Sequence, residues 1–368
     1  MILCEPICLG RQHIPVNVAL VSAIVEYSNI DVKMYCEDEH WNILISQMAP
    51  SYRHRLSHYP IETLSRQDEL GAWLASFSLI RKLKKQSDDI IFLSSTSGLL
   101  DIAKRLIKKN KVFCTFHMAL ARVDKHLPRN PFVRWFSFDS VLRRFRGDGV
   151  KIIVLEETIA EHLIAKYINL AGSVLCLPHP VEPFSQSDMV ETKQINNTIC
   201  FPGTFSLDKG AKDFTALALS VDKTAVSFIV AGKKSPSFCD YDTHLFKIKP
   251  NVEFLERQTF VSFIKSSQYL FLGHNESIYK WCASGVYLDA LKYEVPIIAK
   301  SSEFFRRENQ IVGEIGFFYN HISEATAFIN SKYFVERHNK FKVNMKKLKS
   351  HRAKLFDDNI KLALAIND

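Results

Sequence analysis

The segment from Ala283 to Ala299 contains the residues best suited to bind a charged ligand. Ser284 and Gly285 open a predicted helix over 284–293, and a buried strand over 295–299 follows it. The first N–H groups of a helix have no partner within the helix, so they suit an anion such as a diphosphate. Asp289 lies about one turn further on, where it could accept hydrogen bonds from ribose hydroxyls. An ordinary turn, helix and strand with a solvent-facing Asp explains this segment equally well.

Upstream segments add context. One predicted strand ends in Gly203, the pair Lys209-Gly210 opens a helix, and a later strand ends in Gly232. In this order, with a further strand predicted over 251–255, the chain resembles the C-terminal domain of GT-B glycosyltransferases, particularly the retaining family 4. The resemblance covers 198–300 and reaches the rest of the chain as architecture only. It implies two Rossmann-like α/β domains that face each other across a cleft, with a C-terminal helix crossing back to the first domain.

The resemblance also implies a donor site for a nucleoside diphosphate sugar. Lys209 would offset the charge of the diphosphate, and Asp289 would hold the ribose. The complete predicted donor set is Gly203, Lys209, Gly210, Ser284, Gly285, Val286 and Asp289.

The sequence departs from the family pattern at two places. The Arg expected shortly after the first Gly is missing, because Thr204 and Phe205 follow Gly203. The paired glutamates of the family would fall at Trp281 and Asp289, so the first is absent and Glu276 lies at the wrong spacing. Retention or inversion at the anomeric carbon is therefore left open.

Candidate acceptor-side residues lie in the first half. Gly10, Arg11 and His13 follow the first predicted strand, and Arg11 suits a phosphate or an acceptor hydroxyl. His117 ends another strand, like the family's His beside the donor sugar, although a structural role is as plausible. An inverting enzyme needs a base, for which His13 or Asp124 are candidates by location alone.

Short apolar runs alternate with amphipathic stretches, which predicts parallel βα units. We expect strands at 2–9, 31–36, 89–95, 111–116, 150–155, 173–177, 198–202, 226–231, 251–255, 268–272, 295–299 and 315–319. We expect helices at 15–28, 68–86, 97–109, 157–167, 210–220, 259–266, 284–293 and 321–330.

A segment rich in Pro and Ser over 178–187 separates the two series. We therefore predict an acceptor domain over 1–182, a donor domain over 183–332 and a helical segment over 333–368. That last segment is basic and has apolar Phe341, Met345, Leu348 and Leu355 at helical spacing. An exposed helix of the second domain is the alternative to a helix that crosses back.

The composition describes an ordinary soluble globular chain, with 47% hydrophobic and 24% charged residues among 368. Its eight Cys form no Cys-x-x-Cys motif, which argues against a zinc ribbon or a redox pair. The N-terminus lacks a basic stretch typical of signal peptides, and no apolar run could span a bilayer. We expect a cytoplasmic protein with free thiols, located in part at the inner face of the cytoplasmic membrane.

Positive charge concentrates between Lys104 and Arg146, where twelve Lys or Arg and two Asp give a net charge of +10. Within it, residues 129–146 interleave aromatic and basic residues, as in an interfacial membrane helix; Phe132, Trp135, Phe136, Leu142 and Phe145 would insert into the bilayer. Core aromatics with exposed arginines rank second. Nucleic-acid binding ranks last, because no such module is recognisable.

We expect neither a metal nor another cofactor. Asp240 and Asp242 mimic the metal motif of the other glycosyltransferase fold, GT-A, but they lie in a polar loop without the strand that should precede it.

The sequence thus predicts a glycosyltransferase of the hexosyltransferase type, acting in cell-surface polysaccharide synthesis (capsule, O-antigen or exopolysaccharide). Its partners would be a nucleotide-sugar donor, a glycan or lipid-linked glycan acceptor and an anionic membrane surface, but no nucleic acid. A sugar-nucleotide epimerase or hydrolase of the same fold is one alternative. A non-catalytic basic protein that binds a membrane or polyanion is another.

Overall fold

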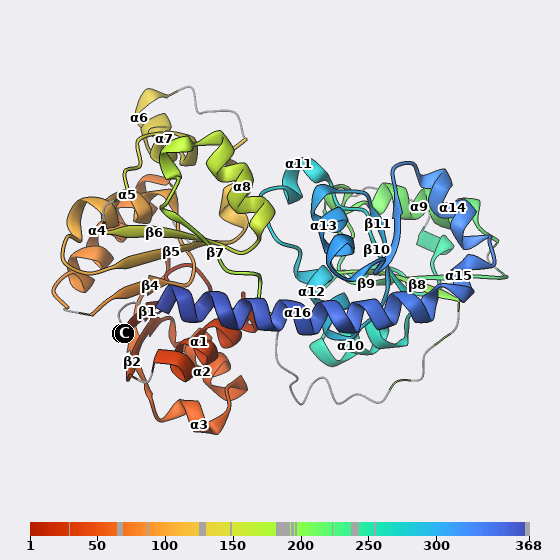
Figure 1. The fold of residues 1–368 in the computed structure, drawn as a ribbon, viewed down its shortest axis with the longest axis horizontal. Helices are drawn as coiled ribbons and strands as arrows, with labels where there is room; N and C mark the ends of the chain where they lie inside the picture. The colour runs from red at the N-terminus through yellow and green to blue at the C-terminus, as the bar shows by residue number, and fades with distance from the viewer. Residues whose placement is uncertain are drawn as a thin grey trace. The chain divides into compact units, whose positions relative to one another are not determined.

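The computed structural model describes residues 1–364 except 29, 65–68, 87, 125–129, 148, 182–191, 193–194, 196, 223, 237–242 and 254. The chain divides into two compact units (Figure 1). Unit 1 comprises Met1–Glu182, Lys280–Ala283 and Lys354–Asp368, and unit 2 comprises Pro183–Tyr279 and Ser284–Ala353. The Pro- and Ser-rich segment predicted to contain the boundary lies mostly outside the described residues.

Unit 1 is built on a seven-stranded parallel sheet in the order β3-β2-β1-β4-β5-β6-β7. Its strands are β1 (Ile2–Cys4), β2 (Val32–Cys36), β3 (Leu56–Pro60), β4 (Ile90–Phe92), β5 (Val112–Phe116), β6 (Val150–Val154) and β7 (Val174–Cys176). Its helices are α1 (Ile14–Ser28), α2 (Asp38–Gln47), α3 (Pro50–Arg53), α4 (Glu69–Leu83), α5 (Ser97–Leu106), α6 (Pro131–Trp135), α7 (Phe138–Arg143) and α8 (Glu157–Lys166).

The strand order fixes which face each helix covers. Parallel crossovers are right-handed, so connections that run toward β3 and connections that run toward β7 leave helices on opposite faces. One core cluster accordingly joins the sheet to α4, α5, α7 and α8, and another joins it to α1 and α2. In the described part of unit 1, no crossover helix covers β5 and β6 on the second face.

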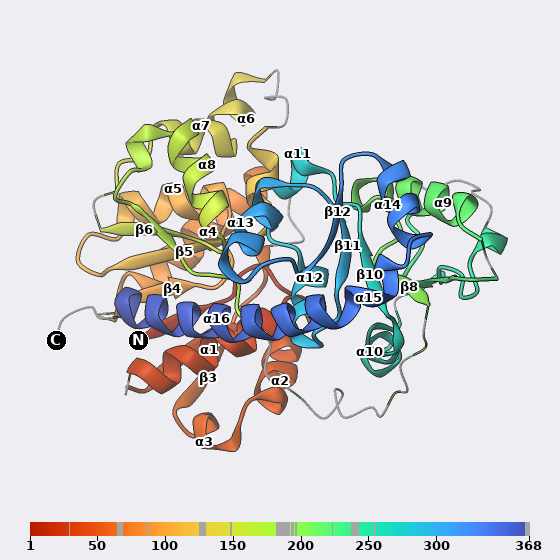
Figure 2. The ribbon, with the colours of Figure 1, turned by 45° about the vertical axis from the view of Figure 1, so that its right-hand side comes forward.

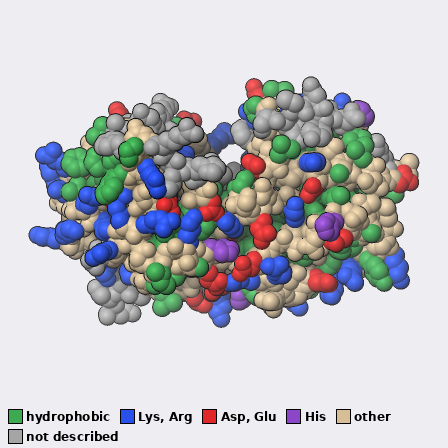
Figure 3. Space-filling model, turned by 90° about the horizontal axis from the view of Figure 1, so that it is seen from above, with side chains coloured by type: hydrophobic (Ala, Val, Ile, Leu, Met, Phe, Trp, Pro, Cys, Tyr) green, Lys and Arg blue, Asp and Glu red, His purple; other side chains and the backbone are tan. Residues whose placement is uncertain are grey.

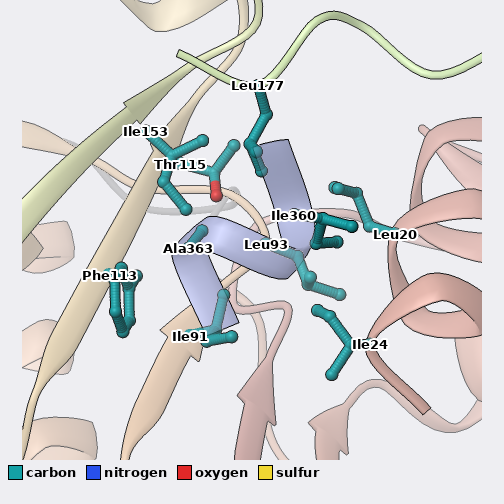
Figure 4. Close-up of a pocket in the computed structure, with 10 residues that line it drawn as sticks. All are labelled: Leu20, Ile24, Ile91, Leu93, Phe113, Thr115, Ile153, Leu177, Ile360 and Ala363. Carbon is teal, nitrogen blue, oxygen red and sulfur yellow. The ribbon is translucent and has the colours of Figure 1, made fainter. Parts of the chain in front are cut away.

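The end of the long C-terminal helix α16 (His338–Leu364) fills that position. Phe356 and Ile360 are buried in the same cluster as α1. The fit leaves an apolar cavity of about 20 Å³, which Ile360 and Ala363 close from one side and Leu20 and Ile24 of α1 border on another (Figure 4). A space of this size holds at most about one water molecule, so the helix end completes the core of unit 1.

Unit 2 contains a five-stranded parallel sheet in the order β12-β11-β10-β8-β9. Its strands are β8 (Thr198–Pro202), β9 (Ser227–Ala231), β10 (Tyr269–Leu272), β11 (Ile297–Lys300) and β12 (Gly316–Tyr319). Its helices are α9 (Ala211–Ser220), α10 (Arg257–Ser266), α11 (Glu276–Tyr279), α12 (Gly285–Lys292), α13 (Glu303–Val312), α14 (Ile322–Ile329), α15 (Tyr333–Glu336) and the larger part of α16. Helices α9 and α14 pack side by side (Figures 1 and 2).

Aromatic rings dominate the core of unit 2. Phe214 of α9 lies at the centre, with ring centroids 5.4 Å from Phe201, 5.5 Å from Phe228, 5.4 Å from Phe246 and 5.2 Å from Phe271. These are ordinary distances for packed aromatic pairs. The cluster therefore ties α9 to three neighbouring strands.

A buried ion pair connects α16 to α13 within unit 2. Arg352 Nη1 lies 3.1 Å from Glu308 Oε1, and their side chains are 4% and 7% exposed. Tyr287 of α12 donates a hydrogen bond to the other carboxylate oxygen of Glu308. The pair thereby links α12, α13 and α16.

Most predicted helices and strands are confirmed to within a few residues, but some predictions are wrong. No strand forms at 251–255 in the described residues, where Asn251 makes only an isolated bridge to Lys233. Strand β3 and helix α13 were not predicted. In α16, Phe341, Met345 and Leu348 are buried as expected, whereas Leu355 is 39% exposed.

We predict that Arg352→Met destabilises the protein by about 3 kcal/mol, because it leaves the Glu308 carboxylate buried without a cation. Adding Glu308→Gln should recover much of this loss. Lys340→Met, which breaks the exposed pair with Glu314, should change the free energy of unfolding by about 0.5 kcal/mol or less. Chemical denaturation of the three variants measures these differences; equal losses for Arg352→Met and Lys340→Met would contradict the prediction.

Candidate functional site

The carboxyl edge of the sheet in unit 2 has a topological switch point. From β8 the chain first adds β9 on one side, then crosses to add β10 on the other. The loops after β8 and β10 therefore diverge, and in open parallel sheets ligands bind where such loops separate.

Glycines bring these loops together. Gly210, with φ of 88°, ends the 3₁₀ turn Leu207–Lys209 and begins α9. A side chain at Gly210 would collide with the backbone of Gly273 after β10, and one at Gly232 would collide with the backbone of Gly203. Contacts this close require glycine, so the edge is lined by backbone rather than side chains.

Lys209 lies beside this glycine surface. A Cβ on Gly203 would be 3.4 Å from Lys209 Nζ and 3.3 Å from Val286 Cγ2. The structure thus brings together three members of the predicted donor set, Gly203, Lys209 and Val286, although Gly203 and Val286 are 83 residues apart in the sequence. An ammonium group next to uncovered backbone suits a phosphate.

The N-terminus of α12 completes the same edge. Ser284 caps the helix by accepting a hydrogen bond from the Tyr287 amide at 3.3 Å. Apart from its chain neighbours and the backbone of its own helix, no described atom lies within 4 Å of the position that a Gly285 Cβ would take, and Gly285 is exposed, so this end of α12 is open to a ligand. His274 Nε2 is 3.5 Å from Ser284 Oγ, and its ring stacks on Tyr279 at 3.9 Å. Sequence reasoning missed His274, whose only signal was its place directly after Gly273.

Asp289 has a cationic partner that the sequence did not reveal. Arg257, the first residue of α10, donates to Asp289 Oδ1 at 2.7 Å, and the Asp289 side chain is 15% exposed. The guanidinium fixes the orientation of the carboxylate. Asp289 as the ribose ligand remains a prediction.

In unit 1 the switch point lies between β1 and β4. His13 follows β1 and His117 follows β5, and their rings meet edge to face at 4.6 Å. His117 Nε2 lies 2.8 Å from the Leu93 carbonyl oxygen, which makes this nitrogen the donor. Burial, with the neighbouring imidazoles of His13 and His179, lowers the pKa of His117 to about 3. Two of the three predicted catalytic residues therefore lie together, and His117 is neutral.

The loop predicted to bind an acceptor or a phosphate already uses one of its amides in a hydrogen bond within unit 1. The Gly10 amide donates to Glu37 Oε2 at 3.3 Å, and the same oxygen accepts from the His40 amide at 2.8 Å. Glu37 is thus the N-cap of α2. Arg11 is exposed on this loop.

Asp124, the third catalytic candidate, is held by strong donors. Its carboxylate lies 2.6 Å from Lys166 Nζ and 2.7 Å from Lys280 Nζ, and Trp281 Nε1 donates to it at 2.6 Å. Burial alone would raise the pKa of Asp124, but these donors outweigh it and hold the pKa far below its usual range. Such a carboxylate is a weak base.

Trp281, where the family has its first glutamate, belongs to the core of unit 1. The side chain is 3% exposed, and Lys166 lies 5.8 Å from its ring centroid. The position therefore serves packing and anchors Asp124.

The prediction of an interfacial membrane helix over 129–146 is in part wrong. Leu142 and Phe145, which we expected to insert into a membrane, are 0% and 1% exposed in the core of unit 1. Among the other aromatics, Phe136 is half-buried, the side chain of Phe132 is not among those described, and Trp135 is 53% exposed with Arg144 stacked on it at 4.4 Å. Exposed Lys and Arg nevertheless gather over unit 1, among them Arg105, Lys108, Lys109, Arg134, Arg143 and Arg146 (Figure 3).

Among the described residues no group of three His, Cys, Asp or Glu could hold a metal. Asp240 and Asp242 lie outside them. None of the seven described cysteines is in a disulfide bond. None of the helices described has the length and apolarity needed to cross a bilayer.

No protein-family model and no curated protein sequence matches this chain. Solved structures do match it over nearly the full length of both chains. A glycosyltransferase from Rickettsia africae ESF-5 is 13% identical with a TM-score of 0.67, covering 100% of this chain and 99% of that one. HepE of Anabaena, solved in complex with UDP-glucose, is 12% identical with a TM-score of 0.61, covering 99% and 98%.

WaaG, a glycosyltransferase involved in lipopolysaccharide biosynthesis, is 11% identical with a TM-score of 0.57, covering all of both chains. At such identities the likeness concerns the fold. The resemblance predicted from the sequence is confirmed at that level, and the chain has the two-sheet α/β fold of the GT-B glycosyltransferases.

Two buried histidines predict a pH dependence of stability. Burial lowers the pKa of His117 to about 3 and, together with the charge of Lys209, that of His274 to about 3. In the unfolded chain both have pKa values near 6.5, so between about pH 6.5 and 3 the unfolded state binds more protons. Stability should therefore fall on acidification, by up to about 1.4 kcal/mol per pH unit for each histidine.

Urea denaturation at pH 7 and pH 5 measures this loss. His274→Asn should reduce the difference between the two pH values by roughly 2 kcal/mol, whereas replacing His54, which is exposed, should leave it unchanged. The same pH dependence in His274→Asn and wild type would refute the assignment.

Proposed function

We propose that this chain is a glycosyltransferase that moves a sugar from a nucleoside diphosphate sugar to a hydroxyl of a glycan or lipid-linked glycan. The observation that carries the proposal is the position of the Lys209 ammonium beside Gly203 and Val286, at the switch point of the sheet in unit 2 and the start of α12. The fold shared with HepE, which was solved with UDP-glucose, supports a nucleotide-sugar donor.

In this proposal unit 2 binds the donor. The amides of Ser284, Gly285 and Val286 and the Lys209 side chain bind the diphosphate, and Asp289, oriented by Arg257, accepts hydrogen bonds from the ribose. As the bond from the anomeric carbon to the diphosphate oxygen breaks, negative charge grows on the leaving diphosphate. Donors already fixed in place stabilise that charge without reorganisation.

Unit 1 supplies the acceptor side, and we assign the base to His13. His13 Nδ1 is buried and makes no hydrogen bond among the described residues. A neutral imidazole can take the proton of the acceptor hydroxyl while its oxygen bonds to the anomeric carbon. Trp281 in place of a glutamate and the tightly held Asp124 both favour this assignment, which predicts inversion.

A role in cell-surface polysaccharide assembly is the specific form of the proposal, supported by the likeness to WaaG. The exposed basic residues of unit 1 and Trp135 support a peripheral location on the inner face of the cytoplasmic membrane. With Leu142 and Phe145 buried, attraction to anionic lipid is mainly electrostatic.

Sedimentation with anionic vesicles should therefore fall strongly between low and high salt. Salt-independent binding, or no binding at low salt, would count against the membrane location.

The donor site is tested by nucleotide binding. Lys209→Ala and Asp289→Asn should each weaken the binding of UDP or GDP by about 1–3 kcal/mol, the loss expected for a hydrogen bond to a charged group. Arg307→Ala, which removes a surface pair with Glu303 in the same unit, is the matched control and should bind normally. Isothermal titration of folded variants gives the answer, and unchanged affinity in both site variants would exclude this donor site.

We also predict that transfer needs no metal, because Lys209 and helix amides take the place of a divalent cation at the diphosphate. Activity, assayed by release of the nucleoside diphosphate, should persist in excess EDTA. Loss of activity with rescue by Mn²⁺ would instead point to Asp240 and Asp242. Release of free sugar without any acceptor would identify a hydrolase.

A further inference from the structure

Glu5, directly after β1, is a fully buried carboxylate that makes no ion pair with any described residue. Its Oε1 accepts from the amides of Ile7 at 3.0 Å and Cys8 at 3.1 Å. Its Oε2 accepts from Asn17 Nδ2 at 3.0 Å and Ser94 Oγ at 2.8 Å. Burial by itself raises the pKa of Glu5, but these four hydrogen bonds outweigh it and leave the pKa below its usual value. Glu5 is therefore an anion surrounded by neutral donors.

These donors hold the loop over 6–13 at both ends. Ile7 and Cys8 lie at its start. Asn17 lies in the first turn of α1, where its backbone N–H donates to the His13 carbonyl at 2.9 Å. Ser94 follows β4, so Glu5 also spans the switch point between β1 and β4. One carboxylate thus connects the loop, the helix and the neighbouring strand.

His40 of α2 holds the middle of the loop. Its Nε2 lies 3.1 Å from Asn17 Nδ2. Because an amide nitrogen can only donate, His40 Nε2 is the acceptor. Its Nδ1 then donates to the Gly10 carbonyl at 2.9 Å. Glu5, Asn17 and His40 are all 0% exposed. We call these three residues the clamp.

The residue that the clamp holds is conformationally strained. His13 has φ of 54°, in the left-handed region that non-glycine residues rarely occupy. Strained residues persist where surrounding structure fixes them, and they concentrate at functional sites. The His13 ring contacts His117 at 4.6 Å, and its Nδ1 is buried without a hydrogen bond among the described residues.

We propose that Glu5 is a positioning residue: through the clamp it fixes the loop over 6–13, holds the ring of His13 against His117, and leaves an uncompensated negative charge in the core beside that loop. The inference rests on the proposed function for the use of His13 as a base. Glu5 itself, enclosed by its four donors, does not touch a substrate. A purely structural Glu5 would hold the loop without any effect of its charge on His13.

Two variants distinguish the charge from the hydrogen bonds. Glu5→Gln removes the charge at nearly the same volume, but its amide nitrogen cannot accept, so it also alters the hydrogen bonds at one oxygen position. Ser94→Ala removes one of those hydrogen bonds and keeps the charge. The titratable groups that act on His13 are Glu5, His40 and His117, and only Glu5 differs in charge between the variants.

The readout is the pKa of His13, followed by NMR of the complete, ligand-free protein and assigned with His13→Asn. Burial lowers this pKa and the Glu5 carboxylate raises it. Glu5→Gln should therefore lower it by a further half unit or more, roughly the effect of one charge across a partly polar interior. Ser94→Ala should leave it near the wild-type value. An unchanged His13 pKa in folded Glu5→Gln, or an equal shift in Ser94→Ala, would overturn the proposal.

Activity provides a second, separable readout. If the wild type transfers sugar, Glu5→Gln should lower kcat about tenfold and leave the KM for the donor unchanged, because unit 2 binds the donor. If the wild type is inactive with every nucleotide sugar, that result counts against the proposed function. The change in the pKa of His13 still tests the clamp in that case. Normal kcat in Glu5→Gln would overturn the clamp alone.

If Glu5→Gln does not fold, Asn17→Ser takes its place, since it cuts the tie to α1 and leaves the carboxylate three donors. The nuclear Overhauser contact between the His13 and His117 rings should then be lost. Its retention would overturn the proposal.

Discussion

The position of the first strand inside each sheet constrains everything that follows. Strands β1 and β8 each have neighbours added first on one side and then on the other, and right-handed crossovers send the resulting helices to opposite faces. The loops that leave the first strand and the strand paired beside it must then separate at the carboxyl edge. Both candidate sites lie at these points: Gly203 to Gly210 with Gly273, His274 and Ser284 in unit 2, and Glu5 to His13 with Ser94 in unit 1. The chemistry differs between them, while the geometric origin is the same.

The two edges use different polar groups because different atoms are left available there. In unit 2, close glycine contacts remove side chains, so backbone amides and one ammonium remain, a set suited to phosphate. In unit 1 the loop after β1 brings His13 against a second imidazole, His117 after β5, and such a pair is suited to proton transfer. Trp281 marks the contrast. Where the family has a carboxylate, this chain places an indole that packs in the core of unit 1 and fixes Asp124. In the proposed function, the absence of this carboxylate makes a base in unit 1 more important.

The local pattern of apolar and polar residues predicted the helices and strands well, because buried parallel strands appear as apolar runs and their helices as amphipathic stretches. The prediction failed where a strand or helix lacks this pattern. Strand β3 lies at an edge of the sheet and is mostly exposed, so its sequence Leu-Ser-His-Tyr-Pro lacks an apolar run. Phe145 was misassigned because aromatic residues beside arginines look alike in a core helix and in a membrane helix. The candidate donor residues were selected through glycine and lysine spacing, which gave no information on their partners. Arg257 is 32 residues from Asp289, and Trp281 is 157 residues from Asp124, distances over which only the fold decides contact.

Two buried carboxylates, Glu308 and Glu5, show that the groups which hydrogen-bond a buried charge determine how far its field reaches. Glu308 faces the guanidinium of Arg352, so the pair is nearly neutral at a distance and acts by linking α12, α13 and α16. Glu5 is satisfied by dipoles, which stabilise the anion without cancelling its charge. Its field therefore extends beyond its own hydrogen bonds, to the imidazoles of His13 and His117. A buried ion pair at this position would hold the loop equally well but would contribute almost nothing to the protonation of His13. The absence of a cation beside Glu5 among the described residues is thus the feature that gives the clamp an electrostatic role.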